Sequence, residues 1–131
     1  MIIYINKLIA LLNYGIKTKK LYINIPFHKS ILTILNIFVD DGYLYGFNFF
    51  SKNNKLFLKI KLKYYHNNNI FLSLKNISTS SHKIYWSFNQ LKYFLNLNRN
   101  INYILSTNKG LISHKEAIKH KIGGLIICSY I

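Results

Sequence analysis

The sequence predicts an α+β fold in which the first half has the order αβαββ and the second half is rich in strands with short helices. Two observations lead to this prediction. Apolar residues recur at helical spacing in two early segments, and from residue 43 onward they alternate with polar residues. Half of the 131 residues are apolar, which is enough to bury a core. This length allows one ordinary domain or two small lobes.

The N-terminal segment is predicted to form a helix and then a strand. The helix, over about residues 4–14, follows from apolar residues at positions i, i+3, i+4 and i+7, namely Ile5, Leu8, Ile9 and Leu12. Gly15 is the expected stop of this helix. After the basic turn at 17–20, residues 21–25 alternate like a strand. Pro26 ends that strand because it has no amide hydrogen to donate.

A second helix and a β-hairpin complete the first half. The helix runs from His28 to Asp40, and its apolar face consists of Ile31, Ile34, Leu35 and Phe38. The hairpin joins strands over 43–50 and 56–65 through a turn at 51–55.

The second strand of this hairpin is predicted to have two different faces. One face is apolar, and it consists of Leu56, Leu58, Ile60 and Leu62. The opposite face is a basic stripe that consists of Phe57, Lys59, Lys61 and Lys63. The stripe is either a contact surface or simply the solvated outer face of the sheet.

The second half is predicted to contain short strands and short helices. The expected strands cover 70–76, 83–86, 101–107 and 123–131. The expected helices cover 88–96 and 114–120, and Ser113 is placed to cap the second of them. The polar stretch at 78–81 is expected to be a loop or a boundary between lobes.

The charge balance predicts a polyanionic partner. The chain has 18 Lys and Arg residues against three acidic residues, Asp40, Asp41 and Glu116, and a formal net charge of +15. So much charge of one sign repels itself in a compact protein, so nucleic acid and an anionic membrane surface are the two candidate partners. Arg99 is the only arginine, and Ile, Asn, Lys and Tyr are abundant. These four residues have AT-rich codons, which suggests an AT-rich organellar genome.

Other classes of function find no support in the sequence. Cys128 is the only cysteine, and the five histidines have no metal-ligand spacing, so no metal or other cofactor is expected and the histidines are expected to face solvent or RNA. An RNA-cleaving enzyme needs paired carboxylates or metal ligands, which the few acidic residues do not supply. The apolar N-terminal stretch is shorter than a membrane span and lacks the features of a signal peptide.

One segment differs from the rest of the chain in its composition. A candidate RNA-binding loop follows the strand over 101–107, and its short polar side chains are suited to base edges, sugars and phosphates: Ser106, Thr107 and Asn108. Lys109 and Lys115 add positive charge, and Gly110 permits a tight bend. Gly123 and Gly124 allow a backbone to approach closely. The bland alternative is an ordinary loop in front of a capped helix.

The segment "ILSTNKGLISHKEAIKHKIGGLIIC" resembles the C-terminal signature of the bacterial type of small-subunit ribosomal protein eight, and the segment "NIPFHKSILTILNIFVDDGYLYGF" is similar to an earlier part of that family. The resemblance implies two small lobes, over 1–66 and 67–131, and binding to the central domain of small-subunit rRNA. It implies that the main RNA contact is made by Ser106, Thr107 and Asn108. In the same family pattern Lys109 and Gly110 shape the loop, Tyr85 makes a supporting contact, and Gly123 and Gly124 form the close-approach turn.

The sequence also departs from the family pattern. Leu125 stands where the family usually has glutamate, and Asn108 replaces a serine. The arginines that the family places near the N-terminus are missing. If the first helix touches RNA, Lys7 and the basic turn at 17–20 must supply the charge. The candidate contacts in this half of the chain are Lys17, Lys19, Lys20 and Lys29.

The predicted function is therefore structural binding and not catalysis. The chain is expected to be a constituent of an organellar small ribosomal subunit, in contact with rRNA and neighbouring small-subunit proteins, with no small-molecule substrate and no membrane partner. The mitochondrion is the expected organelle, and a plastid or apicoplast is the alternative. A cationic membrane-surface protein remains the competing hypothesis, because the charge and the apolar first helix would also suit it.

Overall fold

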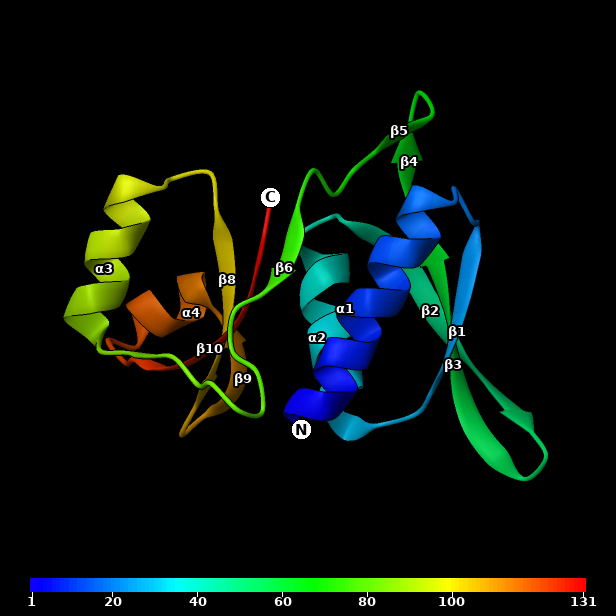
Figure 1. Cartoon of the computed structure of the whole chain (residues 1–131), viewed down its shortest axis with the longest axis horizontal. Helices are drawn as coiled ribbons and strands as arrows, with labels where there is room; N and C mark the ends of the chain where they lie inside the picture. Colours follow the sequence, from blue (N-terminus) through cyan, green and yellow to red (C-terminus); the bar gives the residue numbers. More distant parts are fainter. The chain divides into compact units, whose positions relative to one another are not determined.

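The computed structural model describes residues 1–131, and the chain folds into two compact units. The first unit comprises Met1 and Ile3–Phe71, and the second comprises Ile2 and Leu72–Ile131. Each unit has an antiparallel sheet and helices of its own, so the predicted α+β class is confirmed (Figure 1).

The first unit has the predicted order αβαββ, followed by a small hairpin. Its elements are α1 (Ile2–Lys17), β1 (Tyr22–Pro26), α2 (Lys29–Asp40), β2 (Leu44–Lys52), β3 (Lys55–Leu62), β4 (Tyr64–Tyr65) and β5 (Asn68–Asn69). The central strand β3 pairs antiparallel with β1 on one side and β2 on the other. Residue 66, where the sequence suggests a boundary between lobes, lies in the turn between β4 and β5.

The strand β3 buries one face and exposes the other. Leu58, Ile60 and Leu62 are buried, whereas Lys59 and Lys61 between them are exposed. The predicted alternation is therefore present, and the helices cover only one face of the sheet. Leu56 was expected on the apolar face, but it lies two residues from the hairpin turn and is 44% exposed.

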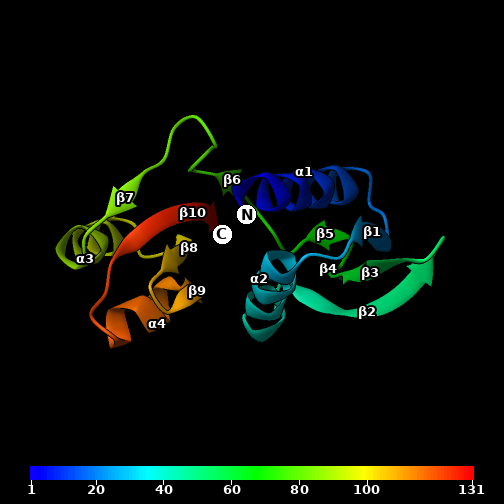
Figure 2. The ribbon, with the colours of Figure 1, turned by 90° about the horizontal axis from the view of Figure 1, so that it is seen from below.

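The first helix is longer than predicted because Gly15 does not stop it. The helix continues to Lys17 and ends at Thr18, whose hydroxyl donates a hydrogen bond to the carbonyl of Tyr14 at 2.8 Å. A Cβ at position 15 would overlap the side chain of Ile23 in β1 and crowd Leu62 in β3. Gly15 therefore serves close packing of α1 on the sheet, and Figure 2 shows α1 running along it.

The second helix begins where the sequence predicts. His28 is its N-cap, and its Nδ1 accepts a hydrogen bond from the backbone N–H of Ser30 at 3.2 Å. The His28 ring also stacks on Tyr4, with ring centroids 3.9 Å apart. His28 is half-buried and thus has a structural role, which the expectation that histidines face solvent or RNA did not include.

The second unit is built around its last strand. Its elements are β6 (Leu74–Asn76), β7 (Tyr85–Trp86), α3 (Phe88–Leu97), β8 (Asn102–Thr107), β9 (Gly110–Ser113), α4 (His114–Lys119) and β10 (Gly124–Tyr130). β10 pairs with β8, which in turn pairs with β9. The short strands β6 and β7 both pair with β10 as well, at its C-terminal and N-terminal ends respectively.

The core of the second unit lies between this sheet and the helices α3 and α4. It is formed by Leu91, Tyr103, Leu105, Ala117 and Ile126. The helix α3 begins with a capping box, in which the Ser87 hydroxyl accepts from the N–H of Gln90 and the Gln90 side chain accepts from the N–H of Ser87.

Three predictions for the second half need correction. The expected strand over 70–76 is reduced to Leu74–Asn76, because Phe71 turns into the first unit and packs against Phe38 and Tyr43. Residues Gly110–Ser113 form the strand β9, which the sequence did not predict. Ser113 is the N-cap residue of α4, but its side chain makes no capping hydrogen bond.

The polar stretch at 78–81 contains a buried hydroxyl that bonds to β10 and to the residue before β7. Ser78 is fully buried, and its hydroxyl donates to the carbonyl of Ile126 in β10. It also accepts a hydrogen bond from the N–H of Ile84 at 3.1 Å. This hydroxyl therefore fills the gap along the edge of β10 between its pairing with β7 and its pairing with β6, where no strand covers that edge.

Ser78→Ala is expected to lower the free energy of unfolding by about 1–3 kcal/mol, because it removes both hydrogen bonds from a buried site. Urea unfolding followed by circular dichroism measures the effect. Ser80→Ala is the matched control, since Ser80 is exposed in the same loop. Equal stability of the two variants would contradict the role given to Ser78.

Candidate RNA-binding surface

The segment predicted as an RNA-binding loop is the tip of the β8–β9 hairpin. Thr107 pairs with Gly110 in the antiparallel ladder, so only Asn108 and Lys109 form the turn. Gly110 has φ +95°, a left-handed conformation that favours glycine. The short polar side chains are therefore held on a hairpin with a defined register.

Thr107 stabilises the turn itself. Its hydroxyl donates to the carbonyl of Gly110 at 3.1 Å and accepts from the N–H of Lys109 at 3.2 Å. By contrast, the Ser106 hydroxyl and the Asn108 side-chain amide make no hydrogen bond within the chain. Ser106 and Asn108 thus keep donors and acceptors available for a ligand, whereas both hydrogen bonds of the Thr107 hydroxyl stay within the turn.

Three strands bring Tyr85 and Ser106 into one row. Leu125 of β10 is opposite Tyr85 of β7 on one side and opposite Ser106 of β8 on the other. Residues that are paired in register point to the same face of a sheet, and this face is opposite to that of the core residue Leu105. Tyr85 is 65% exposed and Leu125 is buried between its neighbours. The two predicted contacts therefore share one face, with an apolar residue between them.

The two glycines at the start of β10 allow backbones to pack together: Gly123 precedes the strand and Gly124 is its first residue. A Cβ at Gly123 would overlap the carbonyl of Trp86 and approach backbone atoms of Ser87 and Phe88. A Cβ at Gly124 would overlap the carbonyl of Ser106. The close approach that the sequence predicts is thus made to the protein's own backbone, and Gly124 positions β10 directly against the hairpin tip.

Lysines surround the hairpin tip. The ammonium group of Lys109 lies 3.3 Å from Nδ1 of His120, so the turn lies beside the C-terminal end of α4. Lys119 and Lys121 flank His120 and are exposed. We refer to Lys109, Lys119 and Lys121 as the hairpin lysine group. Lys115 is also exposed, one helical turn before Lys119.

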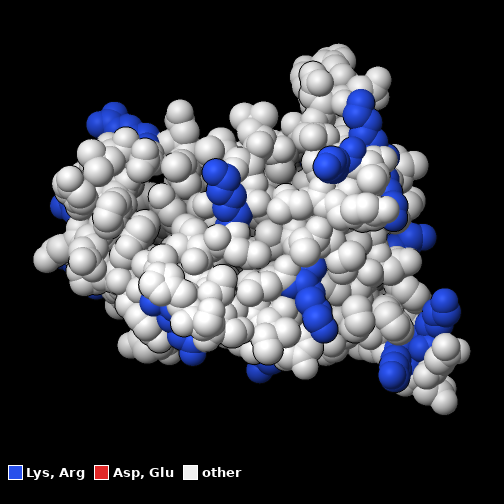
Figure 3. Space-filling view, in the orientation of Figure 1, with Lys and Arg blue, Asp and Glu red and all other residues white.

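Lys119 and Lys121 are absent from the residues predicted to bind RNA. Their place beside the turn depends on the packing of α4 against β8 and β9, which sequence spacing does not reveal. The surface drawn in Figure 3 carries lysines in several places and shows no acidic side chain, as the composition predicts.

His114 is a second histidine with a structural role, and it is buried. It is 8% exposed, and its Nδ1 accepts a hydrogen bond from the N–H of Tyr103 at 3.2 Å. Acceptance at Nδ1 requires that this nitrogen carries no proton. His114 therefore holds the start of α4 against β8, a structural role that the sequence did not predict.

The predicted N-terminal contacts lie in the first unit. Lys17 is in the last turn of α1, and Lys19 and Lys20 follow in the turn before β1. The ammonium group of Lys20 lies 4.7 Å from the centre of the Tyr14 ring. Lys29 is exposed in the first turn of α2. The first three lysines form a basic helix end, and Lys29 belongs to a different helix end.

The single cysteine is buried in β10. Burial raises the pKa of the Cys128 thiol to about 12, and a backbone hydrogen bond with Ile104 lowers it in part. The folded protein holds the thiol proton more tightly than the unfolded chain. The protonated Cys128 thiol therefore makes its full contribution to the free energy of unfolding below the ordinary thiol pKa of 9.0. This contribution is lost as the pH rises toward 12.

Cys128 is expected to resist thiol reagents in the folded protein. A pKa shift from 9.0 to about 12 leaves about a thousandfold less thiolate at pH 8. The measurement is the labelling rate with a maleimide, with and without denaturing urea. Fast, stoichiometric labelling of the native protein would contradict this prediction.

These features define a class of protein. The chain is strongly basic and presents a polar hairpin of defined register beside lysines. This combination is typical of proteins that bind RNA through shape, phosphate contacts and short polar side chains.

Comparison with known proteins identifies the family. Residues 4–130 match the family model described as Ribosomal protein S8. The chain belongs to the ribosomal protein S8 family, which confirms the resemblance seen in the sequence. Members of this family are structural constituents of the ribosome, so the expectation of a non-enzymatic protein is also confirmed.

Relatives from several organisms cover most of the chain. The small ribosomal subunit protein uS8 of Nautilia profundicola is 34% identical over 102 residues, which cover 77% of this chain and 76% of the relative. The same protein of Borrelia garinii subsp. bavariensis is 40% identical over 98 residues, or 74% of this chain and 73% of the relative. The small ribosomal subunit protein uS8c of Phaseolus angularis is 33% identical over 114 residues, 84% of each chain.

The membrane-surface hypothesis gains no support from these comparisons, because the matching family is ribosomal. None of the helices combines the length and the hydropathy needed to cross a bilayer.

Proposed function

We propose that this chain is a structural constituent of the small ribosomal subunit that binds the central domain of small-subunit rRNA and supports assembly of the subunit. The family match covers nearly the whole chain, and the relatives named above are small-subunit proteins. The net charge of +15 supplies the affinity for a polyanion. Neighbouring small-subunit proteins are its other partners.

The observation that carries the proposal is the β8–β9 hairpin. Its turn is held by Thr107, while the half-buried Ser106 and the exposed Asn108 keep polar groups without a hydrogen bond inside the chain. In this proposal, Ser106 and Asn108 contact the sugar, phosphate or base edges of an irregular RNA helix. Tyr85 makes a supporting contact from the same face of the sheet.

The other predicted contacts have distinct parts in this proposal. Lys109 and Lys115 neutralise phosphates next to the hairpin, together with the newly recognised Lys119 and Lys121. Gly110, Gly123 and Gly124 shape the site through their backbone. At the end of the first helix and the start of the second, phosphates are neutralised by Lys17, Lys19, Lys20 and Lys29. In this proposal the second unit, with Leu72–Ile131, is the main rRNA-binding lobe.

We propose the mitochondrion as the site of action, with a plastid or apicoplast as the alternative. The support is the composition, because Ile, Asn, Lys and Tyr are abundant and Arg99 is the only arginine. The measurement is sucrose-gradient sedimentation of ribosomes from purified organelles, followed by mass spectrometry of the small subunit. Detection in plastid subunits alone would overturn the mitochondrial assignment.

The test of rRNA binding compares a central-domain fragment of the cognate rRNA with a scrambled RNA of equal length. We expect the wild-type chain to prefer the cognate RNA by more than about tenfold, as typical specific contacts allow. Ser106→Ala with Asn108→Ala should abolish most of that preference while the salt dependence of binding stays unchanged, because no charge is removed.

The matched control is Ser80→Ala with Asn89→Ala, which makes the same two substitutions at exposed positions away from the hairpin. The control should bind both RNAs as the wild type does. Equal affinity of the wild type for cognate and scrambled RNA would refute specific recognition of the central domain. Loss of preference in both double variants would refute the role of the hairpin.

A further inference from the structure

The outer face of the three-stranded sheet carries lysines and tyrosines. Because Leu58, Ile60 and Leu62 point toward the helices, the alternate residues of β3 point outward. Lys59 lies between Asn24 of β1 and Asn48 of β2, and Lys61 lies between Tyr22 and Gly46. The residues that we call the outer sheet face are Tyr22, Asn24, Tyr45, Asn48, Phe57, Lys59 and Lys61.

The lysines and the tyrosines of this face are in contact with each other. The ammonium group of Lys59 lies 4.3 Å from the centre of the Tyr22 ring, and that of Lys61 lies 5.1 Å from the centre of the Tyr45 ring. Tyr22 is 46% exposed and Tyr45 is 58% exposed. Cation–π contacts at exposed sites are weak, so a phosphate can draw the lysine away and leave the ring open to a base.

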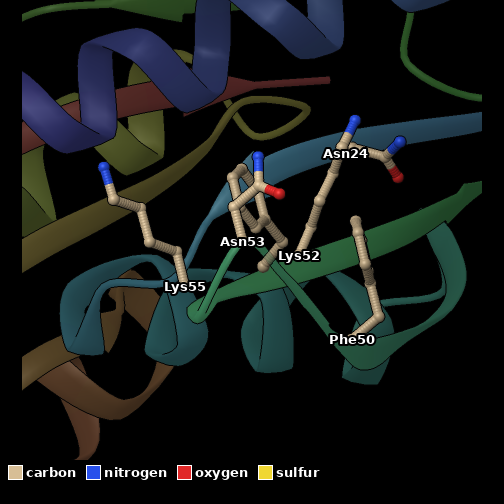
Figure 4. Close-up of a pocket in the computed structure, with 6 residues that line it drawn as sticks. Asn24, Phe50, Lys52, Asn53 and Lys55 are labelled. Carbon is tan, nitrogen blue, oxygen red and sulfur yellow. The ribbon is translucent and has the colours of Figure 1, made fainter.

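Two hollows give this face the shape of a binding surface. The first is lined by Tyr22, Tyr45, Gly46, Phe47, Asn48, Lys59 and Lys61. A Cβ at Gly46 would have no neighbouring atom within 4 Å, so the space above this residue is open. The second hollow is lined by Asn24, Phe50, Lys52, Asn53, Lys55 and Phe57, and Figure 4 shows Lys55 extending away from the other labelled side chains.

The charge of this face has one sign. None of the three acidic residues of the chain belongs to β1, β2 or β3, whereas Lys52, Lys55, Lys59 and Lys61 do. Lys63 follows β3, and its ammonium group donates a hydrogen bond to the carbonyl of Gly42 at 3.1 Å. Charge complementarity therefore requires an anionic partner, and the exposed rings with adjacent asparagines suit unpaired bases better than a folded acidic protein.

We propose that the outer sheet face binds unpaired RNA, with bases stacked on Tyr22 and Tyr45 and phosphates held by Lys59 and Lys61. This second RNA contact belongs to the first unit and is independent of the β8–β9 hairpin of the second unit. The asparagine side chains of Asn24 and Asn48 offer hydrogen bonds to base edges inside the hollows. The proposal rests on the proposed rRNA function only for the identity of the natural RNA.

The test uses the full chain and a fluorescent oligouridine of about ten nucleotides, within the range that such surfaces cover. A duplex of the same length is the comparison probe. Tyr22→Leu with Tyr45→Leu should weaken binding of the single strand by about tenfold or more without changing its salt dependence. Lys59→Gln with Lys61→Gln should lower the slope of log affinity against log salt by about 1 to 2.

Matched controls change exposed residues away from this face. They are Tyr65→Leu with Tyr93→Leu, and Lys75→Gln with Lys92→Gln. Ultraviolet cross-linking of oligouridine to the wild type, followed by mass spectrometry, should find the cross-links on Tyr22 or Tyr45. Thermal unfolding checks that each variant is folded.

Three results would overturn this proposal. The first is an affinity of the tyrosine variant equal to that of its control, and the second is binding of duplex and single strand with equal affinity. The third is normal RNA binding by the tyrosine and lysine variants of the outer sheet face, together with poor incorporation of these variants into small subunits. That result would mean that a neighbouring protein covers the face.

The same experiments separate this proposal from the rRNA-binding proposal. If cognate and scrambled rRNA fragments bind equally well but oligouridine still cross-links to Tyr22 or Tyr45, the hairpin assignment fails and this face stands. The opposite result is that Ser106→Ala with Asn108→Ala loses the preference for cognate rRNA while Tyr22→Leu with Tyr45→Leu binds oligouridine normally. In that case the hairpin assignment stands and the proposal for the outer sheet face fails.

Discussion

Gly123→Ala is expected to destabilise the second unit by about 3 kcal/mol, at the upper end of the cost of overpacking a well-packed site. The added Cβ would overlap the carbonyl oxygen of Trp86 and lie 2.8 Å from the amide nitrogen of Phe88. These are backbone atoms at the end of β7 and the start of α3. They move only if the pairing of Gly124 with Trp86 or the capping box at Ser87 is disturbed.

Urea unfolding measures this effect, and Gly15→Ala is the informative control. A Cβ at Gly15 would also overlap a neighbour, but that neighbour is the flexible end of the Ile23 side chain, which can rotate away. We therefore expect Gly15→Ala to be much less destabilising than Gly123→Ala. Equal stability of Gly123→Ala and wild type would show that the backbone there is not closely packed. The remaining folded fraction of Gly123→Ala should still bind rRNA if the glycine acts only through the fold.

Neutralising the hairpin lysine group is expected to weaken rRNA binding by about a hundredfold near physiological salt. Each phosphate contact adds about 0.7 to 0.9 to the slope of log affinity against log salt, so three contacts account for about two powers of ten between 1 M and 0.15 M. The variant is Lys109→Gln, Lys119→Gln and Lys121→Gln, all at exposed positions. The slope should fall by about 2 to 3.

The matched control neutralises three exposed lysines of the same unit that lie outside the group: Lys75→Gln, Lys83→Gln and Lys92→Gln. Both variants lose the same net charge, so a smaller effect in the control isolates the contribution of position. The preference for cognate over scrambled RNA should survive in the triple-lysine variant, because phosphate contacts position the RNA and the polar tip recognises it. Equal losses in the two variants would mean that net charge alone determines affinity.

The regular elements with a clear apolar period were predictable from the sequence. The helix α2 illustrates this, because Ile31, Ile34, Leu35 and Phe38 repeat at helical spacing and all four are buried. The alternation of β3 was equally clear. The strand β9 was missed because its four residues, Gly110–Ser113, have no alternation of their own and depend on the ladder with β8.

The candidate site was predictable in part. The residues of the hairpin were singled out by their composition and by resemblance to a family, and the chain's membership of that family is now established. The separate roles within the hairpin were not predictable, because Thr107 and Ser106 are adjacent hydroxyl residues in the sequence. Only the turn geometry shows that Thr107 bonds to the turn whereas Ser106 stays free.

By itself, the sequence determined the basic character of this protein, its α+β class and its family, because composition, apolar period and local motifs are properties of the chain. The tertiary structure decided what depends on residues far apart in sequence. It decided that Gly15 allows α1 to pack closely on the sheet and that Lys109 lies beside His120. It also decided that His114 and Ser78 are buried and accept hydrogen bonds from backbone N–H groups. These roles follow from long-range packing and hydrogen bonding, since a side chain meets its partner only after the strands have paired.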